Sequence, residues 1–302
     1  MTYWDRKQIL PKGPVVGFAY GSQGSHKTGL FIKLGLDAIE EKRARVLYIA
    51  AEGAYGIQTA RLPKAREARG MSWDVLEPVW RTEPETFNLL RSEDHEALFE
   101  AYEWLKPDII FIDVLTKVAG GDINHPADAA AIMNTADQLS HRFQAVVVFA
   151  HHPGKDKSRG MLGSALLEAL ADFVLKVKHH DGKVWVEVEK LKDGPADRTV
   201  SYDVDTTRGI PVVVDSTFDE VADFNTEDPI AAAIKEFLDK HPQETFDKKG
   251  LVHKLRGSGA IPFGIAKAED YVASLVDDGQ LVGYAKVEGR GKRTRYTFRR
   301  GI

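Results

Sequence analysis

Apolar runs and amphipathic segments alternate along the first half of the chain. The apolar runs are continuous, as is typical of strands buried on both faces, and lie at residues 15–20, 46–51, 109–112 and 145–150. Apolar residues at three- and four-residue spacing predict helices between these strands, at about 30–38, 57–69, 92–105 and 127–142. A short strand is also expected at Val79–Trp80. This alternation predicts a mainly parallel sheet with helices on both faces.

After residue 170 the apolar runs follow one another without helices between them. They predict strands at residues 173–178, 184–191 and 199–204. Asp181-Gly182 separates the first two and is a strong signal for a hairpin turn. These hairpins would extend the sheet with antiparallel strands, so we expect one α/β domain over residues 1–214.

The C-terminal part has a different pattern. Residues 215–228 are acidic and weakly apolar, which is typical of a linker. Beyond them we expect three short helices and then two strands around a tip rich in Gly, Arg and Lys, at 230–238, 250–255, 266–278, 281–284 and 295–298. This order predicts a small winged-helix domain over residues 229–302.

A loop of small residues joins the first strand to the first helix. Strand, small-residue loop, Lys-Thr and helix together form the layout of a phosphate-binding P-loop. Backbone N–H groups and the helix N-terminus would hold the phosphates, Lys27 would reach the β- and γ-phosphates, and Thr28 would ligate Mg²⁺. ATP and Mg²⁺ are therefore the expected ligands. The alternative is a turn that caps a helix. The residues expected at the nucleotide are Gly21, Ser22, Gln23, Gly24, Ser25, His26, Lys27, Thr28 and Gly29.

His26 is a departure from the usual pattern, which has glycine at this position. A residue with a negative φ angle fits there, provided that the loop does not require a positive one.

Polar residues close three of the predicted strands. In an open parallel sheet, ligands bind beyond the carboxyl ends of the strands. Asp113 can hold the Mg²⁺ that bridges the phosphates, Glu52 can deprotonate the attacking water, and His151 can contact the γ-phosphate. The alternatives are a turn-capping aspartate, a solvated glutamate and a structural histidine.

Composition narrows the class of protein. The chain has no cysteine, which excludes disulfides, zinc fingers and thiol catalysis. No apolar run reaches the ~18 residues of a membrane helix and no signal-peptide pattern is present, so we expect a cytoplasmic protein without a membrane partner. The formal charge is −4, but the residues from Asp228 onward hold 14 Lys and Arg against 10 Asp and Glu. This basic end indicates a polyanion partner.

Four segments together carry a family resemblance: VLYIAAEG, PDIIFIDVLTKVAGGD, VVVFAHHPGKDKSRGMLGSALLEALADFVLKV and VEVEKLKDGP. Over about residues 12–205 the chain closely resembles phage- and plasmid-borne AAA-family ATPases of the RepA helicase type, which are RecA-like P-loop proteins. The resemblance implies a RecA-like core that forms a homo-hexameric ring. It also implies a catalytic glutamate at Glu52 and a γ-phosphate sensor at His151. His26 is a tolerable departure under this resemblance, since some members of the group replace the same glycine.

The same resemblance implies that basic residues of a late hairpin reach the nucleotide site of the neighbouring subunit. Lys190 and Lys192 match that position and, two residues apart, point to the same face of a strand. Their alternative is an exposed charged strand face.

Two basic clusters are the expected contacts to DNA. Lys155, Lys157 and Arg159 lie in a loop that RecA-like proteins turn toward the ring's centre, although this loop has no aromatic residue for base stacking. The wing supplies Arg290, Lys292, Arg293 and Arg295. The third helix of this domain is acidic, so a protein-docking winged helix is the alternative.

These features predict a ring-forming, Mg²⁺-dependent ATPase that acts on DNA as a helicase or translocase in the replication of a phage or plasmid. Two alternatives stay open. One is a nucleotide-switched DNA-binding or regulatory protein that does not unwind DNA. The other is a recombination-associated ATPase that forms filaments on single strands.

Overall fold

The computed structural model describes residues 2–83, 87–154, 160–216, 229–257, 265–277, 281, 283–288 and 295–301. The chain forms two compact units. All elements up to Asp215 belong to the larger unit, and all elements from Pro229 onward belong to the smaller one.

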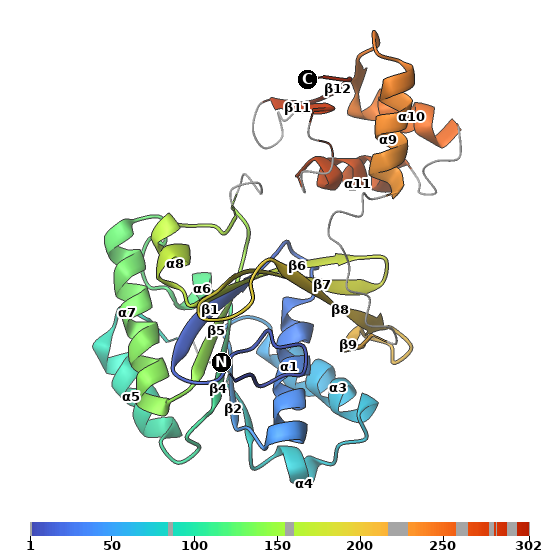
Figure 1. Ribbon diagram of the computed structural model, residues 1–302. Helices are drawn as coiled ribbons and strands as arrows, with labels where there is room; N and C mark the ends of the chain where they lie inside the picture. The colour runs from blue at the N-terminus through green and yellow to red at the C-terminus, as the bar shows by residue number, and fades with distance from the viewer. Residues whose placement is uncertain are drawn as a thin grey trace. The chain divides into compact units, whose positions relative to one another are not determined.

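A nine-stranded sheet is the centre of the larger unit (Figure 1). Its strands are β1 (Val15–Tyr20), β2 (Val46–Ala50), β3 (Trp80–Glu83), β4 (Ile109–Asp113), β5 (Val146–His151), β6 (Phe173–His180), β7 (Lys183–Leu191), β8 (Arg198–Asp205) and β9 (Val212–Asp215). Their order in the sheet is β3-β2-β4-β5-β1-β6-β7-β8-β9. The strands from β3 to β6 in this order are parallel, and β7, β8 and β9 continue antiparallel.

Helices cover both faces of this sheet (Figure 1). They are α1 (Lys27–Lys42), α2 (Ala54–Gly56), α3 (Leu62–Ala68), α4 (Trp73–Leu76), α5 (Ser92–Tyr102), α6 (Leu115–Val118), α7 (Pro126–Phe143) and α8 (Ala165–Leu170), with a π-helical turn at Ile57–Arg61. In β2, Val46, Tyr48 and Ala50 pack in the same cluster as the apolar face of α1, whereas Leu47 and Ile49 pack with α5 and α7. The alternation of side chains along each strand therefore feeds two separate cores.

The α/β architecture expected from the sequence is confirmed, including the antiparallel extension. At the β6–β7 turn, Asp181 and Gly182 have φ angles of 53° and 72°. Two positive angles are what a two-residue type I′ turn requires. The sequence analysis missed β9, which pairs with β8 just before the expected linker. A four-residue edge strand with no amphipathic period gives too weak a signal.

The smaller unit contains α9 (Pro229–Lys240), β10 (Phe246–Asp247), α10 (Lys248–Gly257), α11 (Ile265–Asp277), β11 (Ala285–Glu288) and β12 (Arg295–Phe298). Its three strands form an antiparallel sheet in the order β10-β12-β11, and its helices share an apolar core with Leu281 and Phe298. The prediction of a strand at 281–284 was wrong. Leu281 is buried from a turn, where its carbonyl accepts the N–H groups of Tyr284 and Ala285 at 3.0 and 3.1 Å, so the strand begins only at Ala285.

Candidate active site

The small-residue loop lies at the carboxyl edge of the sheet, between the end of β1 and the start of α1. A Cβ atom on Gly21 would lie 2.1 Å from the carbonyl oxygen of Val177, so only glycine lets the loop pack against β6. Gly24 has a φ of 83°, which also favours glycine. The loop therefore follows the tight path that a phosphate-binding loop needs.

Lys27 is the first residue of α1 and folds back over this loop. Its Nζ donates to the carbonyl oxygens of Gly21 and Ser22 at 2.7 and 3.1 Å, and to Ser25 Oγ at 3.3 Å. Burial lowers the pKa of Lys27, and the carboxylate of Asp113 raises it. The loop thus holds the ammonium group at the place where the sequence predicts phosphates.

Thr28 and Asp113 meet beside Lys27. Thr28 Oγ1 donates to Asp113 Oδ2 at 2.6 Å, and the hydroxyl of Tyr48 donates to the same oxygen at 2.7 Å. A hydroxyl and a carboxylate next to a phosphate loop are the hard oxygen ligands that Mg²⁺ prefers. The two residues fit a Mg²⁺ site, in which the ion would also take phosphate oxygens of the nucleotide.

Glu52 lies two residues beyond β2, and its backbone N–H donates to the carbonyl oxygen of Asp113 at 3.1 Å. Its side chain is exposed. The structure therefore places the backbone of Glu52 beside that of Asp113 and leaves its side chain open to solvent, as a base acting on water requires.

His151 and His152, at the end of β5, lie in different surroundings. The His151 ring is fully buried, lies 6.1 Å from the ring of Phe18, and has Nε2 2.8 Å from the carbonyl oxygen of Leu162. Burial lowers the pKa of His151 to about 4. The ring is neutral near pH 7, packs with the cluster on the α7 side of the sheet, and has a buried Nδ1 without a hydrogen-bond partner among the described residues. The ammonium of Lys27 also lowers its pKa.

His152 follows the last residue of β5 and is half-buried. Burial lowers the pKa of His152, as does the ammonium of Lys27, whereas the carboxylates of Glu52 and Asp113 raise it. The ring is therefore close enough to all three charged groups for them to influence its protonation. The sequence analysis missed this residue, although strand alternation could have found it, because residue 152 continues the face of residues 148 and 150 that packs toward α1.

His26 takes a left-handed conformation with a φ of 64°. The condition for an easy fit of a side chain here, that the loop does not require a positive φ, is therefore not met. A non-glycine residue costs roughly 1–2 kcal/mol there. Its ring packs edge-on against the ring of His179, with centroids 4.3 Å apart, and this contact offsets part of the cost.

Lys190 and Lys192 lie at the end of the strands opposite the P-loop, where the parallel strands begin. β7 runs antiparallel to β6 and ends where β6 begins, with Leu191 opposite Phe173. Lys190 Nζ donates to the carbonyl oxygens of Glu168 and Ala169, each at 2.9 Å. Lys192 follows the end of β7, and its Nζ lies 3.5 Å from Asp172 Oδ1. Lys190 thus reaches the last turn of α8 and Lys192 reaches the connection between α8 and β6, about 20 Å along the strands from the P-loop.

Most of the predicted DNA contacts lie outside the described residues: Lys155, Lys157, Arg159, Arg290, Lys292 and Arg293. Arg295 is described and lies exposed at the first residue of β12.

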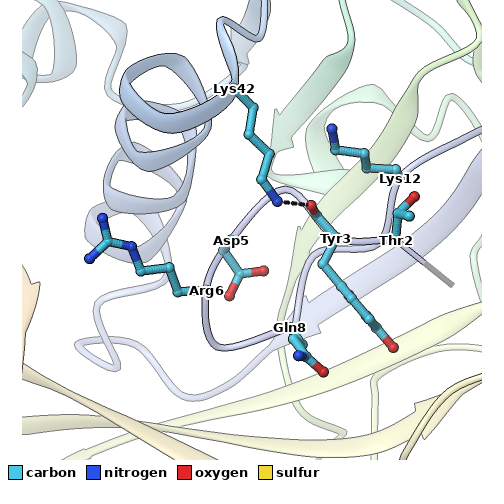
Figure 2. Close-up of a pocket in the computed structure, with 7 residues that line it drawn as sticks. All are labelled: Thr2, Tyr3, Asp5, Arg6, Gln8, Lys12 and Lys42. Carbon is cyan, nitrogen blue, oxygen red and sulfur yellow. Dashed lines mark hydrogen bonds between the residues drawn. The ribbon is translucent and has the colours of Figure 1, made fainter.

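A pocket of about 400 Å³ lies at the far end of α1 (Figure 2). Its lining includes Asp5, Lys12 and Lys42. Lys42 is the last residue of this 16-residue helix, about 24 Å from the P-loop at its start. The pocket is therefore separate from the site around Lys27. Across the described ranges, no helix is long and apolar enough to span a bilayer.

Comparison with known proteins agrees with this architecture. A family model described as AAA domain matches residues 4–158. The crystal structure of the RadB recombinase is similar with a TM-score of 0.54 and 15% identity, covering 68% of this chain and 93% of that chain. A second solved structure, described as an ATPase domain, is similar with a TM-score of 0.50 and 16% identity, covering 67% of this chain and 86% of that chain. No curated protein matches the sequence.

Proposed function

Because this chain belongs to the AAA domain family, whose model matches residues 4–158, we propose that it is a Mg²⁺-dependent ATPase that acts on DNA. The observation that carries the proposal is the meeting of Thr28 and Asp113 at 2.6 Å beside the Lys27 ammonium. These groups come from a P-loop and from the end of a neighbouring strand, as the phosphate and metal sites of P-loop NTPases do.

Each residue has a distinct task in this proposal. Lys27 binds the β- and γ-phosphates, and Thr28 and Asp113 hold Mg²⁺, which neutralises charge on the phosphates. Glu52, whose backbone bonds to that of Asp113 and whose side chain is exposed, takes a proton from the attacking water. His152, rather than His151, contacts the γ-phosphate, because the charges of Lys27, Glu52 and Asp113 all act on its ring, whereas of these only Lys27 acts on the ring of His151.

We further propose that the protein works as a ring of identical subunits, in which Lys190 and Lys192 serve the neighbouring subunit. Their position at the edge opposite the P-loop supports action across an interface and disfavours action on the subunit's own nucleotide. The loop at 155–159 and the smaller unit would contact DNA. The order of helices and strands in that unit supports a winged helix. Unwinding or translocation of DNA is the use that we favour.

ATP turnover in the presence and absence of single-stranded DNA tests this function. We expect DNA to accelerate turnover, and Glu52→Gln to reduce it by at least ~10²-fold while nucleotide binding persists, because the amide keeps the shape of the side chain but cannot accept a proton. Strand displacement distinguishes a helicase from a regulatory ATPase, and closed rings distinguish it from a filament-forming protein. A folded protein without ATP turnover would contradict the proposal.

A further inference from the structure

Tyr48 contacts the site from inside the core. It lies on β2, two residues before the end of the strand, and its side chain is fully buried. Its ring lies 6.0 Å from that of Trp80, 5.9 Å from that of Phe111 and 6.4 Å from that of Phe31. These neighbours come from β3, β4 and α1 and fix the ring, so the hydroxyl position is fixed as well.

The hydroxyl of Tyr48 donates to Asp113 Oδ2 at 2.7 Å, and Thr28 Oγ1 donates to the same oxygen. The two donors are not equivalent. Thr28 is itself an expected Mg²⁺ ligand, so its bond to Asp113 cannot hold the carboxylate independently of the metal. Tyr48 is anchored by the core and can keep its bond whether or not the ion is present.

We propose that Tyr48 is a positioning residue that holds the Asp113 carboxylate in the orientation Mg²⁺ requires. With Oδ2 held by the phenol, the other carboxylate oxygen is left to face the ion or its water ligands. Partners that orient a metal ligand typically contribute 10–100-fold to metal affinity. The proposal rests on the proposed nucleotide site but adds a residue that no P-loop motif contains.

A Mg²⁺ titration of nucleotide binding tests the role of the hydroxyl. The probe is a fluorescent, non-hydrolysable ATP analogue, and the proteins are the parent and Tyr48→Phe, which keeps the ring and removes only the hydroxyl. We expect affinity in EDTA to stay within about twofold of the parent. The Mg²⁺ concentration for half-maximal enhancement of binding should rise by at least ~10-fold.

Tyr202→Phe is the matched control. Tyr202 is also buried, in the same apolar cluster, but its hydroxyl has no hydrogen-bond partner among the described residues. This variant should keep the Mg²⁺ dependence of the parent. Thermal melting without nucleotide checks that both variants fold.

Three results would overturn the proposal: an unchanged Mg²⁺ dependence in Tyr48→Phe, an equal shift in Tyr202→Phe, or a Tyr48→Phe protein that does not fold. The last would assign the hydroxyl a structural role only. A parent protein that shows no Mg²⁺-dependent nucleotide binding would instead contradict the proposed function itself, so the two failures can be told apart.

Discussion

The strands of the nine-stranded sheet carry different charged groups at their two ends. We call these the carboxyl edge, where the parallel strands end, and the amino edge, where they begin. At the carboxyl edge, Lys27 bonds to the loop that precedes it, and Thr28 bonds to Asp113, beside the N-terminus of α1. At the amino edge, Lys190 bonds to carbonyl oxygens near the end of α8, and Lys192 faces Asp172. A helix N-terminus attracts anions, whereas the last carbonyls of a helix attract cations. The first edge thus suits the phosphates that we propose, and the second gathers cations about 20 Å away along the strands.

The largest predicted effect comes from the lysines of the amino edge. The double change of Lys190 and Lys192 to Ala should leave ATP binding and assembly intact but reduce turnover by ~10³-fold, the scale of an arginine finger. The reason is that a cation delivered by a neighbouring subunit stabilises charge in the transition state. Steady-state ATP turnover, nucleotide affinity and molecular mass measure the three properties.

Mixing this double variant with Lys27→Ala protein sharpens the comparison. Each variant is inactive alone, yet some mixed interfaces would pair an intact P-loop with intact lysines, so partial recovery of turnover is expected. If mixed rings form without any recovery, the two lysines do not act across subunits.

For Asp5, in the N-terminal segment near the amino edge, we predict a smaller effect on stability that depends on pH. Burial raises the pKa of Asp5 from 3.8 to about 6, even though its carboxylate accepts the N–H groups of Ile9 and Leu10 at 3.0 and 2.8 Å. Between about pH 4 and pH 6, the Asp5 carboxyl is therefore protonated in the folded protein but ionised in the unfolded chain. The stabilisation is therefore fully present below about pH 4 and is lost as the pH rises through 6.

Asp5→Asn should consequently raise the free energy of unfolding at pH 7.5 by up to about 3 kcal/mol, because the neutral amide oxygen can still accept both N–H groups. The gain over the parent should vanish near pH 4. Urea denaturation at several pH values measures it, with Asp74→Asn, an exposed carboxyl on α4, as the control. A gain of equal size at pH 4 and pH 7.5 would show that the carboxyl does not titrate as described.

Short sequence patterns were sufficient to predict much of the candidate site at the carboxyl edge. The P-loop spacing and the polar residues that close buried strands predicted where Lys27, Thr28, Asp113 and Glu52 would gather. The contact between Tyr48 and Asp113 could not be predicted in this way, because it depends on the pairing of β2 with β4, which lie more than 60 residues apart.

Two other features escaped the sequence for different reasons. The left-handed conformation of His26 follows from the path of the loop into α1, and a motif does not specify that angle when its glycine is replaced. The choice between His151 and His152 depends on which face of β5 each side chain occupies. That face was readable from the strand's alternation, but only once the packing side of α1 was known.

ATP binding to the parent and to Lys27→Ala is the most direct test of the central claim, with Lys192→Ala as a matched loss of one lysine at the other edge. Loss of the Lys27 ammonium removes charge-assisted bonds to phosphate, so affinity should fall by at least about 10-fold while the melting temperature without nucleotide stays close to that of the parent. Lys192→Ala should bind ATP as the parent does. Equal ATP affinity in the parent and a folded Lys27→Ala protein would contradict the assignment of the carboxyl edge as the nucleotide site.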